Sequence, residues 1–190
     1  MLEIEAIKER HSVRKYRPER IEPDTVQKIN EKIAELNAEG NLHFQFIADV
    51  GKTYNKLVNR TMGLSSAPSV IACVGPDDDT VEQRIGYYGE KLVLYAQEIG
   101  LNTCWAGMFN RNNINAEVKD GEKLVISIAI GYGADKGKPH KSKTMEQVVE
   151  ANGDRPFWFN KGVEMALLAP TAINQQKFKI RLNEDETVDF

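Results

Sequence analysis

Two short apolar runs limit the folds that are open to this chain: SVIACVG at residues 69–75 and LVISIAI at residues 124–130. Each run is far shorter than the roughly 20 apolar residues that a membrane-spanning helix needs. Apolar runs of this length are typical of strands that are buried inside a sheet. The chain is therefore expected to fold as a globular domain around buried strands.

Residues 80–99 carry the strongest helix signal, which Gly100 closes. One apolar stripe recurs at helical spacing: Val81, Ile85, Tyr88, Leu92, Tyr95 and Ile99. Four further apolar side chains widen that face: Tyr87, Val93, Leu94 and Ala96. Burial on more than one side is expected for such a helix, and a homodimer would provide it.

The remaining elements alternate between helix and strand. Helices are expected from Pro23 to Gly40, from the capping box of Thr144 and Gln147 through Val149, and over residues 156–169. Further strands are expected in LHFQFIADV, NTCWAGM, KLVISIAIGYG and KFKIRL. This order predicts an α+β fold, with one central, mostly antiparallel sheet and helices on both faces, in a single domain over residues 1–190.

Composition excludes several classes of function. The chain has 25 Lys and Arg against 28 Asp and Glu, a net charge of −3, which argues against a nucleic-acid or anionic-membrane partner. The N-terminus MLEIEAIKER has no apolar signal core, and Cys73 and Cys104 are best explained as buried free thiols. The three histidines lack metal-ligand spacing, so no metal site is expected. We expect a cytoplasmic protein.

Two parts of the chain follow the same order of elements. Residues 25–49 and residues 157–182 each read as helix, polar loop and strand, with an asparagine ahead of the strand. The pattern is compatible with an internal duplication and equally with coincidence, since helix–loop–strand units are common.

Four polar or glycine-containing segments could bind a ligand. RHSVRKY places Arg10, Ser12 and Arg14 at alternate positions, where guanidinium and hydroxyl groups suit a phosphate. KPHKSK is a second basic cluster, and the Asn174 and Gln176 carboxamides suit the edge of a heteroaromatic ring. In CWAG, small residues at a strand end allow a planar ligand to approach the backbone. Taken singly, the two basic segments are better explained as solvated turns or loops, and the Asn174–Gln176 loop also fits an ordinary helix-to-strand connection.

Jointly, these segments resemble the FMN-dependent nitroreductase family. RHSVRKY resembles its R-x-S-x-R signature, and EKLVLYAQEIGLNTCWAGMF resembles its central helix and the strand G-L-G-T-C-W-x-G-G-F. APSVIACVG, ISIAIGYG with KSKTMEQVV, and APTAINQQKF resemble three further motifs, the last of them A-P-S-A-x-N-x-Q-P-W. That last motif usually follows the signature closely, but here it comes at residues 169–178, as in the branch labelled putative TM nitroreductases. Lys177, Phe178 and Met108 depart from the motifs.

The resemblance implies a homodimer with FMN at the subunit interface. Carried over by motif, Arg10, His11, Ser12 and Arg14 would hold the phosphate and ribityl groups, and Lys141 and Lys143 would complete the phosphate cluster. Asn174 and Gln176 would face the flavin ring, and the backbone of Ala106 and Gly107 would lie near the flavin N5.

The implied activity is an oxidoreductase that takes a hydride from NADH or NADPH and reduces a nitroaromatic, quinone or similar acceptor by a ping-pong mechanism. Two alternatives stay open: a flavin-binding protein without turnover, and a degenerate interaction domain that binds no flavin. The ending TVDF begins a strand that stops at Phe190, so the native gene product is expected to extend further or to hold this tail loosely.

Overall fold

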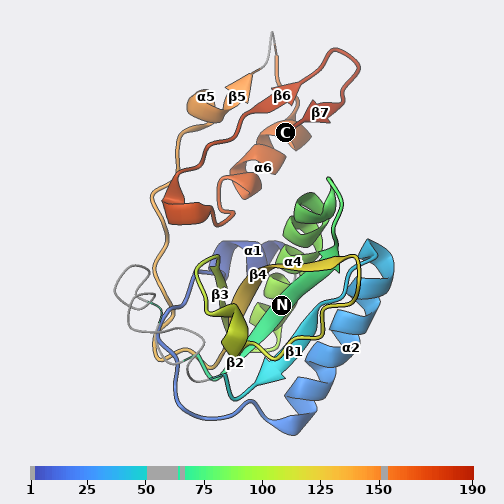
Figure 1. Ribbon diagram of the computed structural model, residues 1–190. Coiled ribbons are helices and arrows are strands. Elements are labelled where there is room, and N and C mark those ends of the chain that lie inside the picture. Colours follow the sequence, from blue (N-terminus) through green and yellow to red (C-terminus); the bar gives the residue numbers. More distant parts are fainter. Residues whose placement is uncertain (1–2, 51–63, 65–66, 151–153) are drawn as a thin grey trace. The chain divides into compact units, whose positions relative to one another are not determined.

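The computed structural model describes residues 3–50, 64, 67–150 and 154–190. Its backbone divides into two compact units, Met1–Lys138 and Pro139–Phe190, and each is described by itself (Figure 1). A compact unit is not the same as an independently folding domain, so the single domain remains a prediction.

A four-stranded sheet forms the centre of the first unit. Its strands are β1 (Gln45–Ala48), β2 (Ser69–Pro76), β3 (Asn102–Ala106) and β4 (Glu122–Gly131), in the order β1-β2-β4-β3. All three pairings are antiparallel, which confirms the predicted character of the sheet. The two apolar runs of the sequence become the two central strands.

Strand β2 is buried on both of its faces. Ile71 and Cys73 belong to one core cluster, whereas Val70, Ala72 and Val74 belong to another. Successive side chains of a strand point to opposite faces, so a continuously apolar run serves two cores at once.

The first core lies between the sheet and two long helices, α2 (Pro23–Gly40) and α4 (Val81–Glu98) (Figure 1). Ile29 and Leu36 of α2 and Ile85 and Leu92 of α4 meet Ile128 of β4 in this cluster. Burying each such side chain contributes about 1.5–3 kcal/mol. The apolar stripes of the two helices face this core.

The second core covers the opposite face of the sheet. Val13 and Tyr16 of the N-terminal segment pack there with Ala129 of β4 and with Cys104 and Ala106 of β3. The described part of this face is covered by extended segments rather than by the long helices. The N-terminal segment thereby reaches the strand that carries CWAG.

Helix α4 is also contacted by α1 (Glu3–Glu9) of the same chain, whose Ala6 is fully buried. Part of the apolar width of α4 is thus explained by packing inside the chain. Tyr87 is 62% exposed on the same helix. Burial of α4 on two sides is therefore no argument for a dimer by itself.

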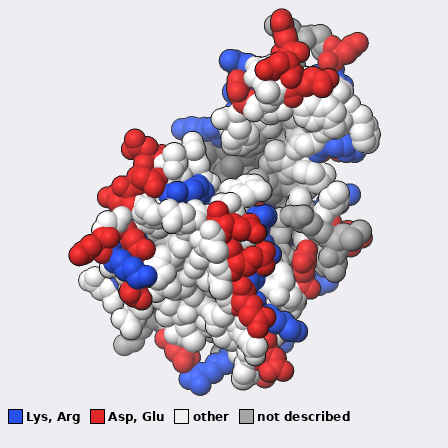
Figure 2. Space-filling view, turned by 90° about the vertical axis from the view of Figure 1, so that its right-hand side faces the viewer, with Lys and Arg blue, Asp and Glu red and all other residues white. Residues whose placement is uncertain are grey.

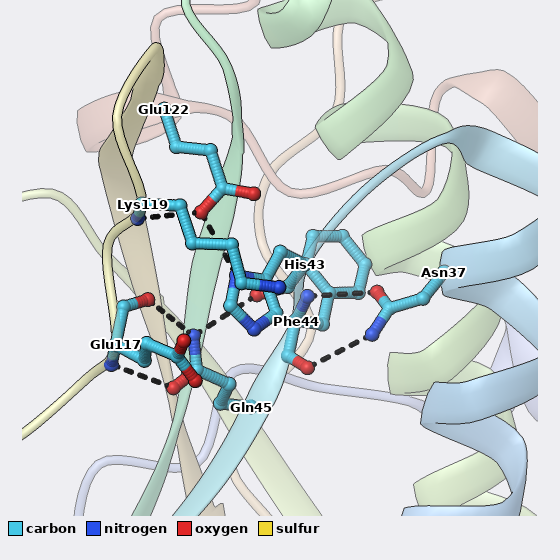
Figure 3. A network of polar contacts seen from close by, with 7 residues as sticks. All are labelled: Asn37, His43, Phe44, Gln45, Glu117, Lys119 and Glu122. Carbon is cyan, nitrogen blue, oxygen red and sulfur yellow. Dashed lines mark hydrogen bonds and ion pairs between the residues drawn. The ribbon is translucent and has the colours of Figure 1, made fainter.

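A polar network joins the end of α2 to the sheet (Figure 3). The Asn37 side chain accepts a hydrogen bond from Phe44 N–H at 2.7 Å and donates to Phe44 C=O at 3.0 Å. His43 Nδ1 lies 2.9 Å from Glu122 Oε2, the oxygen that also accepts from Lys119 N–H. These contacts fix the turn into β1 beside the start of β4.

The second unit has a small sheet that the sequence analysis did not anticipate. Strand β5 (Val149–Glu150) pairs parallel to β6 (Ile180–Leu182), which pairs antiparallel to β7 (Val188–Asp189). Strands β6 and β7 form a hairpin; β6 lies within the expected strand KFKIRL but is shorter, and β7 lies within TVDF.

Two helices complete this unit, α5 (Met145–Val148) and α6 (Phe157–Ala166). Gln147 Oε1 accepts from Thr144 N–H at 2.9 Å, as the capping box predicts. Helix α6 ends at Ala166, before the predicted residue 169, because Leu168 and Ala169 bond to the carbonyls three residues back. A small core holds the unit together: Val148, Phe159, Val163, Leu167 and Ile180.

Candidate functional site

The RHSVRKY segment runs as an extended chain beside β3, near the start of that strand. Val13 N–H donates to Thr103 C=O at 2.9 Å, and Ser12 forms a parallel bridge with Thr103. Tyr16 forms an antiparallel bridge with Gly133, just after β4. The structure therefore brings two of the predicted segments together, the arginine signature and the strand that carries CWAG.

Arg10 is only 6% exposed and lies at the end of α1. Its Nε is 3.3 Å from Glu90 Oε1, and the other carboxylate oxygen accepts from Trp105 Nε1–H at 2.8 Å. Burial raises the pKa of Glu90, while the Arg10 charge and the Trp105 hydrogen bond act in the opposite direction. Glu90 thus links the signature to β3 through two side-chain contacts.

Sequence reasoning missed Glu90. It lies inside the motif EKLVLYAQEIG, next to Gly89, whose missing side chain leaves room for the Trp105 ring. A Cβ on Gly89 would lie 2.4 Å from Trp105 Cη2. The sequence signal that could have pointed to Glu90 is the Gly-Glu pair, followed by a lysine, within a helix that carries an apolar face.

Cys104 lies beneath the signature and is 3% exposed. Burial raises the pKa of its thiol, although the charges of Arg14 and Arg10 and a hydrogen bond with Ser12 lower it in part. Burial also raises the pKa of Cys73. Both cysteines are free and protonated, so neither has the thiolate character of a nucleophile.

Arg14 and His11 line the outer side of the signature. Arg14 is exposed, and its Nη1 donates to Ser12 C=O at 3.3 Å. Gly137, with φ of 69°, approaches so closely that a Cβ there would lie 2.9 Å from His11 Cβ. Only glycine fits this position, both for its backbone angle and for its contact.

The backbone at the end of β3 is bare. Ala106 is buried, and its carbonyl accepts from Ser127 Oγ at 3.1 Å. Gly107 is exposed, and a Cβ built on it would meet no heavy atom within 4 Å. The peptide between these residues can be approached closely by a planar ligand.

In the second unit, the structure brings Lys141 and Lys143 together with Asn174 and Gln176. Asn174 Nδ2 donates to Lys141 C=O at 3.0 Å, and Gln176 Nε2 donates to the same carbonyl at 2.9 Å. Lys143 N–H donates to Gln176 Oε1 at 2.8 Å. The two segments that the sequence separates by some thirty residues are one hydrogen-bonded cluster.

The Asn174 loop has an unusual backbone. Ile173, Asn174 and Gln176 all have positive φ, and Ile173 is 96% exposed. Thr171 Oγ1 accepts from Gln176 N–H at 3.1 Å. Thr171 and Ile173 were not among the predicted site residues.

Described residues of the second unit line two hollows. One of about 390 Å³ is mainly apolar and adjoins the Asn174 loop; its walls include Pro170, Thr171, Gln175, Phe178 and Phe190. A larger one of about 750 Å³ is lined largely by charged residues, including Glu150 and Arg181, and by none of the predicted site residues.

Charged residues are interspersed over the face shown in Figure 2, and its described Lys and Arg form no broad continuous area. Within the described ranges, no helix is long and apolar enough to cross a membrane. Among the same residues, no group of three or more His, Cys, Asp or Glu could hold a metal ion.

A family model described as putative TM nitroreductase matches residues 3–190. This chain belongs to that family. The match spans both compact units and all ten predicted site residues. It confirms the resemblance drawn from the motifs.

Solved structures of nitroreductases share the fold. A putative nitroreductase from Thermotoga maritima is 23% identical with a TM-score of 0.66, over 97% of this chain and 73% of that one. A Bacteroides fragilis nitroreductase with bound FMN is 23% identical with a TM-score of 0.55, over 76% and 95% of the two chains. A putative nitroreductase from Desulfovibrio desulfuricans in complex with FMN is 18% identical with a TM-score of 0.59, over 83% and 98%. No curated protein matches the chain.

Proposed function

We propose that this chain is an FMN-dependent oxidoreductase that takes a hydride from NADH or NADPH and reduces a nitroaromatic, a quinone or a similar acceptor by a ping-pong mechanism. The observation that carries the proposal is the packing of the arginine signature against β3, the strand that ends at the bare Ala106–Gly107 peptide. Membership of the nitroreductase family and the FMN-bound relatives support it.

The residues fit a phosphorylated flavin. Arg14 offers an exposed guanidinium beside Ser12, and Lys141 and Lys143 offer ammonium groups on an ordered loop. We propose that Arg10, His11, Ser12 and Arg14 hold the phosphate and ribityl groups together with Lys141 and Lys143. Asn174 would contact the ring edge, and Ala106 and Gly107 would leave its reactive face accessible. When bound, FMN would accept the hydride and pass electrons to the acceptor, chemistry that belongs to the cofactor.

The protein's own contribution is binding, orientation and access. Neither free cysteine is activated, which fits a reaction that needs no side-chain nucleophile. Two buried free thiols also suit a reducing compartment, so we propose a cytoplasmic location. We further propose that the active form is a homodimer.

The decisive experiment is an absorbance titration of the purified protein with FMN and with riboflavin, followed by anaerobic additions of NADH and NADPH. FMN should bind much more tightly, because charge-assisted hydrogen bonds contribute about 1.5–3 kcal/mol each. Bleaching by either nicotinamide identifies a reductase. Bound FMN that neither nucleotide reduces would indicate a flavin carrier, and a protein that stays colourless would refute the proposal.

Asn174 and Asn41 provide a matched test of the ring contact. Both are exposed asparagines with left-handed backbone, at φ of 56° and 48°. Asn174→Ala should weaken FMN binding about 5- to 150-fold and shift the flavin reduction potential, because a lost partner costs about 1–3 kcal/mol. Asn41→Ala should leave FMN affinity nearly unchanged. The reverse pattern would place the ring contact in the early loop.

A further inference from the structure

Gln176 differs in its burial from the other predicted ligand-binding residues of the second unit. It is 3% exposed, whereas Asn174 and Lys141 are exposed. A buried carboxamide must find its hydrogen-bond partners locally, because an unpaired buried amide is costly. The role of Gln176 can therefore be inferred from the groups to which its side chain is hydrogen-bonded.

The Gln176 carboxamide binds the backbone of residues 141–143 on both sides of Ser142. Its Nε2 donates to Lys141 C=O at 2.9 Å, and its Oε1 accepts from Lys143 N–H at 2.8 Å. In a β-sheet, a neighbouring strand would bind such a segment in the same way, by accepting from one of its N–H groups and donating to one of its carbonyl groups. The side chain thus takes the place of a strand along the lysine segment.

The donors of this carboxamide are fully used. A glutamine amide has two N–H donors, and here the second points to Asn174 Oδ1 at 2.9 Å. Asn174 Nδ2 in turn donates to Lys141 C=O at 3.0 Å. No N–H of Gln176 is left for the edge of a bound ring.

The backbone of Gln176 strengthens the same connection. Its carbonyl accepts from Lys143 Nζ at 2.6 Å, and its N–H donates to Thr171 Oγ1 at 3.1 Å. Main chain and side chain of one residue therefore fix both the backbone and the ammonium group of Lys143.

We propose that Gln176 is a positioning residue that holds Lys141 and Lys143 in place for a phosphate and does not itself contact the flavin ring. This inference rests on the proposed function, since it assigns the two lysines to the FMN phosphate. It changes the role that the family motif implies for Gln176 and leaves the role of Asn174 as it is.

FMN and riboflavin distinguish the two roles, because they share the ring and differ in the phosphate. Dissociation constants for both flavins are measured by fluorescence quenching with the wild type, Gln176→Met and Asn174→Ala. Gln176→Met keeps the length of the side chain and removes its hydrogen bonds. It should reduce the preference for FMN over riboflavin about tenfold, the scale of one charge-assisted hydrogen bond. Asn174→Ala should weaken the binding of both flavins, and it should reduce the preference for FMN less than Gln176→Met does, because its only direct bond to the lysine segment is the one to Lys141 C=O.

Equal losses for both flavins in Gln176→Met, or no loss at all, would overturn the positioning role while wild-type FMN binding keeps the proposed function intact. A wild type that binds neither flavin would refute both. If Gln176→Met does not fold, Gln176→Asn is used, which keeps the carboxamide on a side chain one methylene shorter. In a double-mutant cycle with Lys143→Met, the losses in FMN affinity should not add. Additive losses would show that Gln176 and Lys143 act independently and would contradict the inference.

Discussion

The segment at residues 173–176 has three residues with left-handed backbone: Ile173, Asn174 and Gln176. Asparagine adopts left-handed backbone readily, but a β-branched residue there is an outlier. Ile173 has φ of 49° and ψ of 26°, and its almost fully exposed side chain gains no packing in return. The hydrogen bonds of Asn174 and Gln176 to the lysine segment hold this conformation in place. Such strain is often found at binding sites.

Ile173→Asn should stabilise the protein by about 1 kcal/mol, because asparagine removes most of the left-handed penalty. Ile173→Val is the matched control, since it keeps the β-branch and should bring no gain. Chemical denaturation of the three proteins measures the difference. An asparagine variant no more stable than the valine variant would show that Ile173 is not strained.

At the scale of elements, α4 organises the first unit. One side of it faces the sheet, and α1 packs against it from the same chain. Its Gly89 and Glu90 both meet Trp105 of β3, one through close packing and one through a hydrogen bond. The helix thereby sets the position of the strand that ends in Ala106 and Gly107.

Two glycines of α4 provide a paired test of this contact. Gly89→Ala should destabilise the protein by about 1–3 kcal/mol, because its methyl group would overlap the Trp105 ring. Gly86→Ala should stabilise it by about 0.5–1 kcal/mol, since a Cβ there meets no heavy atom within 4 Å and alanine favours a helix. Urea denaturation measures both. Equal effects of the two changes would contradict the packing of Gly89 on Trp105.

The network at the start of β4 gives a prediction about pH. Burial acts to raise the pKa of Glu122, but the hydrogen bonds with His43 and from Lys119 N–H outweigh it and hold this pKa below its ordinary value. A carboxyl group with a lowered folded-state pKa stabilises the fold above its unfolded pKa, and this stability is lost as pH falls through the folded value. Glu122→Gln should therefore reduce the loss of stability on acidification from pH 5 downward. Denaturation curves at several acidic pH values test this, and an unchanged pH dependence would exclude Glu122 as a contributor.

At the level of the whole molecule, the chain forms two compact units, and the ten predicted site residues are divided between them. The first holds the arginine signature and the Ala106–Gly107 peptide, and the second holds the lysines with Asn174 and Gln176. The family match spans both. The smaller unit has a core of few residues and a short sheet, so it has little apolar burial of its own.

We expect the FMN-loaded protein to be a dimer in light scattering, with Tyr87 of α4 at the contact, because it is the large exposed aromatic residue of the predicted dimer face. Tyr87→Glu should shift the protein toward monomer, since a carboxylate would be desolvated in the contact. Val118→Glu is the control, an exposed apolar residue of the loop before β4. A stable FMN-loaded monomer of the wild type would contradict the dimer.

Elements whose signals are local could be predicted from the sequence. The stripe of α4, the capping box of Thr144 and the apolar runs of β2 and β4 depend on neighbours a few residues away, so periodicity and capping predict them. The family motifs were also readable, because each is a short contiguous segment. The partner of each polar group, in contrast, becomes known only from the folded chain. Arg10 forms an ion pair with Glu90 of another helix, and the Gln176 carboxamide binds Lys141, 35 residues away. The motif suggests that Gln176 contacts the ligand, but its carboxamide is hydrogen-bonded to other residues of the protein. A hydrogen bond is determined by the position of both partners in space, and side-chain chemistry alone does not specify the second one.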